Sequence, residues 1–207
     1  MALPQTRSAF DIDAYLAWEE TQEERHEYLA GEVFAMSGGS DTHFTILGNL
    51  FATLRGAFSG KPCRPFVSGM KVRVSAADTV FYPDVFVTCD ERDRAPEGRL
   101  AKEHPVFVAE VLSASTAAFD RGRKFEIYQR IPALREYLLI EQDRPHADLF
   151  RKNDEGLWVL HPVAPGGTVE LRSLSLTLPL AVLYEDVEFP EEPPLPWPMP
   201  SPGSAPG

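Results

Sequence analysis

The sequence predicts an α/β or α+β domain in which a central mixed β-sheet is flanked by helices. Three segments carry apolar residues at helical spacing, and short runs rich in aromatic and β-branched residues, which favour strands, lie around them. Because helical and strand-like segments interleave, they are expected to share one core. The 207 residues and 43% hydrophobic content suit one domain with an appendage, or at most two small domains.

The first expected elements are a helix, a hairpin and a second helix. Apolar and acidic residues alternate at near-helical spacing over 11–24. Residues 26–36, HEYLAGEVFAM, place a glycine between two apolar arms, which is typical of a tight hairpin. The second helix is expected over about 41–58, because Ser40 and Asp41 are N-cap candidates and apolar residues then recur at intervals of three and four.

The remaining elements are strands and one further helix. Strands are expected over residues 63–75 and 79–88 and, after a polar segment, over 105–113. Residues 116–131 look helical and end before a proline, which disfavours helical backbone at the residue preceding it. Three short strand candidates follow, at 135–142, 146–152 and 156–162.

The C-terminal segment has a different composition. Residues 188–207 contain eight prolines in twenty residues and favour an extended, solvated conformation. We therefore expect a domain over 1–187 and a proline-rich acidic tail over 188–207. A flexible tail is the main expectation, and docking of its apolar residues onto the domain or a partner is the alternative: Leu195, Trp197 and Met199.

Charge and cysteine content limit the classes of function. The net charge of −11 argues against a protein that coats nucleic acid electrostatically. The acidity lies at the two ends, however, since residues 33–172 carry eighteen acidic and eighteen basic side chains. A nucleic-acid substrate is therefore disfavoured but not excluded. With no apolar run near the roughly 20 residues of a membrane span and no signal-like start, we expect a cytoplasmic protein in which Cys63 and Cys89 are free thiols.

Two apolar strand segments each contain a single acid, Asp84 in FYPDVFV and Glu110 in FVAEVLS. A carboxylate among buried apolar side chains is costly unless it is paired, and proline cannot donate to a sheet ladder. If the strands are neighbours, the two carboxylates meet and repel unless a cation neutralises them or one is protonated. Mg²⁺ suits such a pair, since it is bound by one or two carboxylates, waters and substrate phosphates.

A basic segment follows the second acid. Arg121, Arg123 and Lys124 lie near the start of the third helix, where Asp120 is expected as an N-cap. A lysine beside a bound metal could stabilise charge on a phosphate, or position or deprotonate the attacking water. Two strand acids followed by a lysine therefore predict phosphodiester hydrolysis.

These motifs resemble the Uma2 family, formerly a domain of unknown function, within the PD-(D/E)xK restriction-endonuclease-like nuclease superfamily. The resemblance rests on YLAGEVFAMSGGSDTHFTILGNL, YPDVFV, VAEVLSASTAAFDRGRKFEIYQR and REYLLIE, and covers roughly residues 25–142. It implies a restriction-endonuclease-like fold with Asp84 as the PD aspartate and Glu110 as the second acid. It also implies Glu32 as the upstream glutamate of the GE motif and His43 as the family's histidine.

The sequence departs from the superfamily pattern at one position. The E-x-K spacing would place a lysine at 112, where this chain has Leu112. In sequences that resemble Uma2 the lysine comes from the following helix, which here is Lys124. A long side chain entering from a neighbouring helix can reach the same point.

The resemblance implies a Mg²⁺- or Mn²⁺-dependent endonuclease acting on DNA more than on RNA. It assigns metal binding to Asp84 and Glu110, further catalytic roles to Lys124 and Glu32, and accessory roles to His43 and Asp120. A homodimer is expected for two reasons. Cleaving both strands of DNA suits a pair of active sites related by two-fold symmetry, and apolar β-strands at a sheet edge favour pairing between chains. The alternatives are an inactive nuclease fold that binds nucleic acid or assists assembly, and a metal-free acid pair acting on a neutral substrate.

Overall fold

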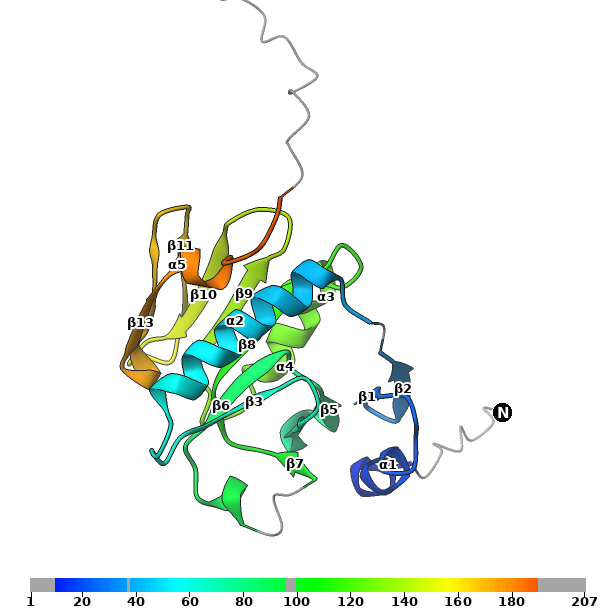
Figure 1. Cartoon of the computed structure of the whole chain (residues 1–207). Helices are drawn as coiled ribbons and strands as arrows, with labels where there is room; N and C mark the ends of the chain where they lie inside the picture. The colour runs from blue at the N-terminus through cyan, green and yellow to red at the C-terminus, as the bar shows by residue number, and fades with distance from the viewer. Residues whose placement is uncertain (1–9, 37, 96–99, 190–207) are drawn as a thin grey trace, which may run out of the picture.

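The computed structural model describes residues 10–36, 38–95 and 100–189 (Figure 1). Its centre is a six-stranded sheet of order β11-β10-β9-β8-β6-β3. Strands β8 and β9 are parallel and the other neighbours are antiparallel, which confirms the predicted mixed sheet. The strands are β3 (Arg64–Val67), β6 (Val85–Thr88), β8 (Pro105–Leu112), β9 (Glu136–Glu141), β10 (Ala147–Lys152) and β11 (Trp158–Val163).

One face of this sheet is covered by helix α2 (Asp41–Ala57), with α5 (Leu180–Leu183) and a hairpin beside it (Figure 1). Ser40 begins α2 as predicted, because its side chain accepts a hydrogen bond from the His43 N–H at 3.1 Å. Ile46, Leu50 and Leu54 then reach the sheet and are fully buried. The hairpin was not predicted as separate strands, and it is formed by β12 (Thr168–Leu171) and β13 (Leu176–Pro179).

The opposite face packs against a second helix and a second sheet. The predicted helix over 116–131 is α3 (Ala117–Phe119), a π-helical turn η4 (Asp120–Lys124) and α4 (Phe125–Tyr128), which follow one another without a break. The second sheet has the order β2-β1-β5-β4-β7. Its strands are β1 (His26–Leu29), β2 (Glu32–Ala35), β4 (Lys71–Val74), β5 (Thr79–Phe81) and β7 (Ala101–Lys102).

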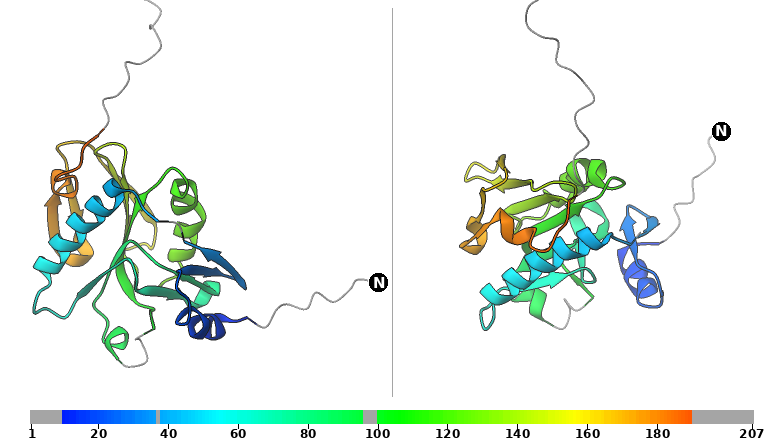
Figure 2. Two further views of the ribbon diagram at one scale, coloured as in Figure 1. Left: turned by 45° about the vertical axis from the view of Figure 1, so that its right-hand side comes forward. Right: turned by 45° about the horizontal axis from the view of Figure 1, so that its top comes forward.

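The N-terminal helix α1 (Ile12–Glu19) packs on β1 and β5. It is shorter than the predicted 11–24 because the Thr21 and Gln22 N–H groups bond to carbonyls at its end, forming turns. Short 3₁₀ turns complete the fold at Ser75–Ala77, Arg92–Arg94 and Arg172–Leu174. Figure 2 shows α1 and the β1–β2 hairpin on the side of the molecule away from the β12–β13 hairpin.

Two segments that we predicted as single strands are each divided. Residues 79–88 form β5 in the second sheet and β6 in the central sheet, and residues 82–84 link them. Pro83 lacks an N–H group, so the ladder cannot continue through it and the chain passes between sheets. Residues 63–75 likewise divide into β3 and β4, and Ser68 between them has a positive φ of 23°.

The prediction of two free thiols is wrong, because Cys63 and Cys89 form a disulfide. Cys63 immediately precedes β3 and Cys89 immediately follows β6, and the paired register places Arg64 opposite Thr88. The cysteines are therefore the next cross-strand pair, with Cα atoms 4.0 Å apart. The spacing of the two cysteines in the sequence could not predict this contact, because the contact depends on which strands pair.

Of the expected tail, only residues 188–189 are described. Phe189 packs against the central core, and its ring centroid lies 5.5 Å from that of Tyr184. Residues 190–207, with the three apolar residues considered for docking, lie outside the described part. Among the helices that the structure describes, none combines the length and apolar character needed to cross a membrane.

Candidate functional site

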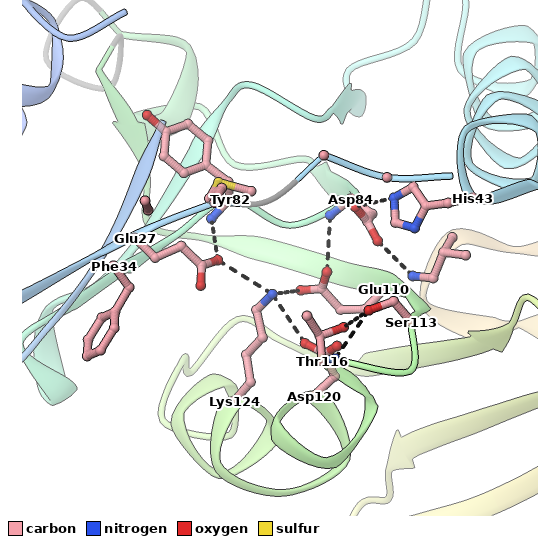
Figure 3. Close-up of a pocket in the computed structure, with 15 residues that line it drawn as sticks. Glu27, Phe34, His43, Tyr82, Asp84, Glu110, Ser113, Thr116, Asp120 and Lys124 are labelled. Carbon is pink, nitrogen blue, oxygen red and sulfur yellow. Dashed lines mark hydrogen bonds and ion pairs between the residues drawn. The ribbon is translucent and has the colours of Figure 1, made fainter. Parts of the chain in front are cut away.

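The two strand acids meet at the edge between the sheets, as the sequence predicts. Strands β6 and β8 pair antiparallel with Val85 opposite Ala109, so Asp84 and Glu110 are adjacent (Figure 3). The Asp84 N–H donates to Glu110 Oε2 at 3.2 Å, and the Val111 N–H donates to Asp84 Oδ2 at 2.7 Å. The backbone therefore fixes the orientation of both carboxylates.

Lys124 reaches the same point from the helix (Figure 3). Its Nζ lies 2.9 Å from Glu110 Oε1, 3.4 Å from Asp120 Oδ1 and 3.5 Å from Glu27 Oε1. Lys124 is the last residue of the π-helical turn, a feature that is frequent at functional sites. Leu112, at the position where the short superfamily pattern expects lysine, is instead buried in the apolar cluster between sheet and helix.

The charges in this group are strongly coupled. Glu110 is 3% exposed, and burial raises its pKa well above the usual value, although Lys124 opposes the shift. Burial favours the neutral form of Lys124, but the charges of Glu110 and Glu27 raise its pKa well above the ordinary range. The neighbouring carboxylates therefore favour the ammonium form of Lys124. Tyr128 also donates its hydroxyl to Glu110 Oε1, at 3.0 Å.

His43 lies on the other side of Asp84. Its Nε2 is 3.1 Å from Asp84 Oδ1, and the opposite ring nitrogen, Nδ1, is buried without a hydrogen-bond partner among the described residues. Burial lowers the pKa of His43, but the hydrogen bond and charge of Asp84 outweigh it, so the pKa is raised. Gly39 lies against the ring, since a Cβ there would be 2.7 Å from His43 Cδ2.

The structure does not bring Glu32 to this group. Glu32 begins β2 at the turn of the hairpin, where it is exposed. The glutamate in the site is Glu27 of β1, whose Oε1 accepts the Tyr82 N–H at 3.2 Å and faces Lys124. Glu27 shares one property with the other two acids, because it is the single carboxylate of its strand, HEYL. It was missed because the GE motif directed attention to the turn.

Asp120 joins the site, but it is not the N-cap that we predicted. Its N–H bonds to the Thr116 carbonyl at 2.9 Å, so it already lies inside the helix, where it is buried beside Lys124. The start of the helix is stabilised instead by Ser113, whose Oγ accepts the Thr116 N–H at 3.2 Å.

These groups line a cavity of about 190 Å³ between the two sheets. The described residues contain no cluster of three or more His, Cys, Asp or Glu side chains arranged to hold a metal. Asp84 and Glu110 still suit Mg²⁺ or Mn²⁺, because hard cations take oxygen ligands and Mg²⁺ keeps several waters when few carboxylates bind it. The cavity supplies two such carboxylates, beside the backbone of Val111.

Comparison with known proteins identifies the family. A family model described as "Uma2: Putative restriction endonuclease" matches residues 12–182. The chain belongs to the Uma2 family. Two relatives from Synechocystis, both named as uncharacterised proteins, are 38% identical over 177 residues (86% of this chain, 92% of the relative) and 35% identical over 146 residues (70% and 82%).

The Uma2 fold is also seen in a solved structure. The crystal structure of "a putative nuclease belonging to DUF820" from Anabaena variabilis superposes with a TM-score of 0.71. The match covers 84% of this chain and 97% of that one at 16% identity, so it shows a shared fold. The predicted family and the restriction-endonuclease-like fold class are both confirmed.

Proposed function

We propose that this Uma2 protein is a Mg²⁺- or Mn²⁺-dependent endonuclease that hydrolyses phosphodiester bonds in DNA. The main support is the convergence of Asp84, which immediately precedes β6, Glu110 of β8 and Lys124 of the following helix. Lys124 Nζ lies 2.9 Å from Glu110, and Glu110 accepts the Asp84 N–H. Two strand acids and a lysine around one cavity match the needs of phosphodiester hydrolysis.

Each side chain has a role in this proposal. Asp84 and Glu110 would hold the divalent ion, which polarises a phosphate and lowers the pKa of a bound water. Lys124 presents a fixed positive charge where charge accumulates on the phosphate, and Glu27 and Asp120 hold its ammonium in place. His43 orients Asp84 through Oδ1, the oxygen that does not accept the Val111 N–H.

The first alternative is a nuclease fold without turnover that binds nucleic acid or supports assembly, and the net charge of −11 favours it modestly. The second is acid–base hydrolysis of a neutral substrate by the acid pair without a metal. The raised pKa of Glu110 favours this second alternative, whereas the ammonium of Lys124 beside it argues against a free acid.

The test combines metal binding and cleavage on the same samples. Calorimetry with Mg²⁺ and Mn²⁺ is run on the wild type, on Asp84→Asn and on Asp143→Asn, an exposed aspartate outside the cavity. Plasmid, single-stranded DNA and RNA are then offered as substrates. We expect binding and DNA cleavage that disappear only in Asp84→Asn. Metal binding without cleavage of any substrate favours the inactive fold, and no binding at millimolar metal rejects the metal-dependent enzyme.

We also propose that the protein is a homodimer, and the edge strand β11 supports this. It has a neighbour on one side only in the described sheets, and Val159 and Leu160 on it are exposed. Sedimentation velocity is expected to give twice the 23.1 kDa chain mass. Leu160→Glu would then shift the equilibrium toward monomer, because a charge on an edge strand opposes pairing.

A further inference from the structure

Large apolar side chains are exposed at the mouth of the cavity. Phe34, Met36 and Phe44 are 48%, 39% and 51% exposed. Phe34 and Met36 line the cavity itself, in which Figure 3 labels Phe34. The other exposed large apolar residues of the described chain lie elsewhere, and three of these four lie on or beside β11: Leu100, Leu157, Val159 and Leu160.

The cavity continues into a second hollow that also borders Asp84. This hollow, of about 340 Å³, shares Met36, His43 and Asp84 with the first and is also lined by Phe44. The two together form one cleft, which we call the aromatic cleft. Phe34 lines the first hollow, Phe44 lines the second, and both hollows border Asp84.

Cations in the aromatic cleft already have partners. Lys124 is surrounded by three carboxylates, and the Arg25 guanidinium donates to the Ser68 carbonyl and lies over the Tyr82 ring, 5.9 Å from its centroid. The cleft is also lined by more acids than bases. Proteins that hold a nucleic-acid backbone by charge offer unpaired Lys and Arg to several phosphates. This cleft has little to offer a phosphate beyond the reacting one.

Apolar contact must then supply most of the affinity for a nucleic acid. Exposed aromatic rings bind bases by stacking, in which each base contributes about five- to hundredfold in affinity. The faces of bases in a duplex are covered by their neighbours, and exposing one requires unstacking. Only unpaired bases present free faces to Phe34 and Phe44.

We propose that the aromatic cleft selects DNA with unpaired bases, and that Phe34 and Phe44 stack on bases on either side of the reacting phosphate. The inference rests on the proposed nuclease function, because it takes Asp84 as the point where the phosphate is held. It makes the substrate class single-stranded, gapped or frayed DNA instead of intact duplex.

Binding without cleavage tests the inference directly. Fluorescence anisotropy in EDTA is measured with a labelled single strand, its blunt duplex and a duplex with a short gap. The variants are Phe34→Leu and Phe44→Leu, which keep apolar bulk but lose the ring, and Phe34→Tyr, which keeps the ring. Leu100→Ala removes an exposed apolar side chain that lines neither part of the cleft and lies outside β11, and it serves as the control.

We expect the single strand and the gapped duplex to bind at least tenfold more tightly than the blunt duplex. Each leucine variant is expected to weaken single-strand binding about tenfold, while Phe34→Tyr and Leu100→Ala leave it unchanged. Equal affinity for blunt duplex, or leucine variants that bind like the wild type, would overturn the inference, even if Asp84-dependent cleavage is observed. Ring-dependent binding of single strands with no cleavage would uphold the inference and reject the proposed hydrolysis. A matched RNA strand shows whether the sugar is also read.

Discussion

A methyl group at position 39 is expected to uncouple His43 from Asp84. In Gly39→Ala, the new Cβ would lie 2.7 Å from His43 Cδ2 and 3.0 Å from Cγ. Ordinary contact between carbon atoms begins near about 3.4 Å, so the ring must move by about 0.7 Å. A shift of that size is enough to lengthen the 3.1 Å contact between Nε2 and Asp84 to about 3.8 Å, beyond hydrogen-bonding range.

The loss of this hydrogen bond should be visible in the titration of His43. The bond and the charge of Asp84 raise the pKa of His43 in the wild type, whereas burial lowers it. In Gly39→Ala the pKa is therefore expected to fall toward or below the ordinary 6.5. Because the folded pKa is raised in the wild type, protonated His43 stabilises the fold below pH 6.5, and this is lost as pH rises through the folded pKa. The difference in free energy of unfolding between variant and wild type should accordingly increase at low pH. This effect adds to a destabilisation of about 1–3 kcal/mol from overpacking by the new methyl group.

NMR titration of the imidazole protons measures this pKa, with His43→Gln to assign the resonance among the five histidines. Gly38→Ala is the matched control, because no atom lies within 4 Å of a Cβ built at position 38. If His43 titrates identically in Gly39→Ala and the wild type, or if Gly38→Ala shifts it as much, the proposed contact does not set the pKa.

Three further predictions concern stability. Lys124→Met should destabilise the fold by about 3–5 kcal/mol in urea at pH 7, because it leaves buried carboxylates unpaired, whereas exposed Arg123→Met should change little. Glu110→Gln should flatten the dependence of the free energy of unfolding on pH above pH 4.5. Because the folded-state pKa of Glu110 is raised, its protonated form stabilises the wild-type fold below that pH, and this contribution is lost as the pH rises. A variant whose stability depends on pH as steeply as that of the wild type would contradict this. Cys63→Ser should lower stability by about 3 kcal/mol by opening the loop of sequence separation 26 that ends at Cys89, and dithiothreitol should affect only the wild type.

Sequence patterns were sufficient where a local rule and the tertiary structure agree. The N-cap and apolar spacing of residues 41–58 located α2 to within one residue. The isolated acids at 84 and 110 predicted adjacent strands, because a buried carboxylate needs a partner and a neighbouring strand can bring one. The site was therefore predictable from the same rule that makes buried charge costly.

Other features depend on long-range pairing that no local pattern encodes. Predicting the disulfide requires the knowledge that β3 pairs with β6. Choosing Glu27 over Glu32 as the site residue requires the knowledge of which strand of the hairpin faces the helix. Asp120 is of a residue type that is common at N-caps, but it lies inside the helix, because Ser113 already accepts a hydrogen bond from the first turn. In each case the residue type was informative and its spatial partner was not visible.

The position of Lys124 has a consequence for how this protein can evolve. Its single ammonium contacts Glu27 from the second sheet, Glu110 from the central sheet and Asp120 from the helix between them. One side chain thus links the two sheets and the helix through ion pairs and is also the proposed catalytic cation. A mutation there would remove three ion pairs together with the proposed catalytic cation, so a relative without activity would still be under pressure to retain the lysine. The presence of this lysine in a relative is consequently a poor guide to whether that relative is an active nuclease.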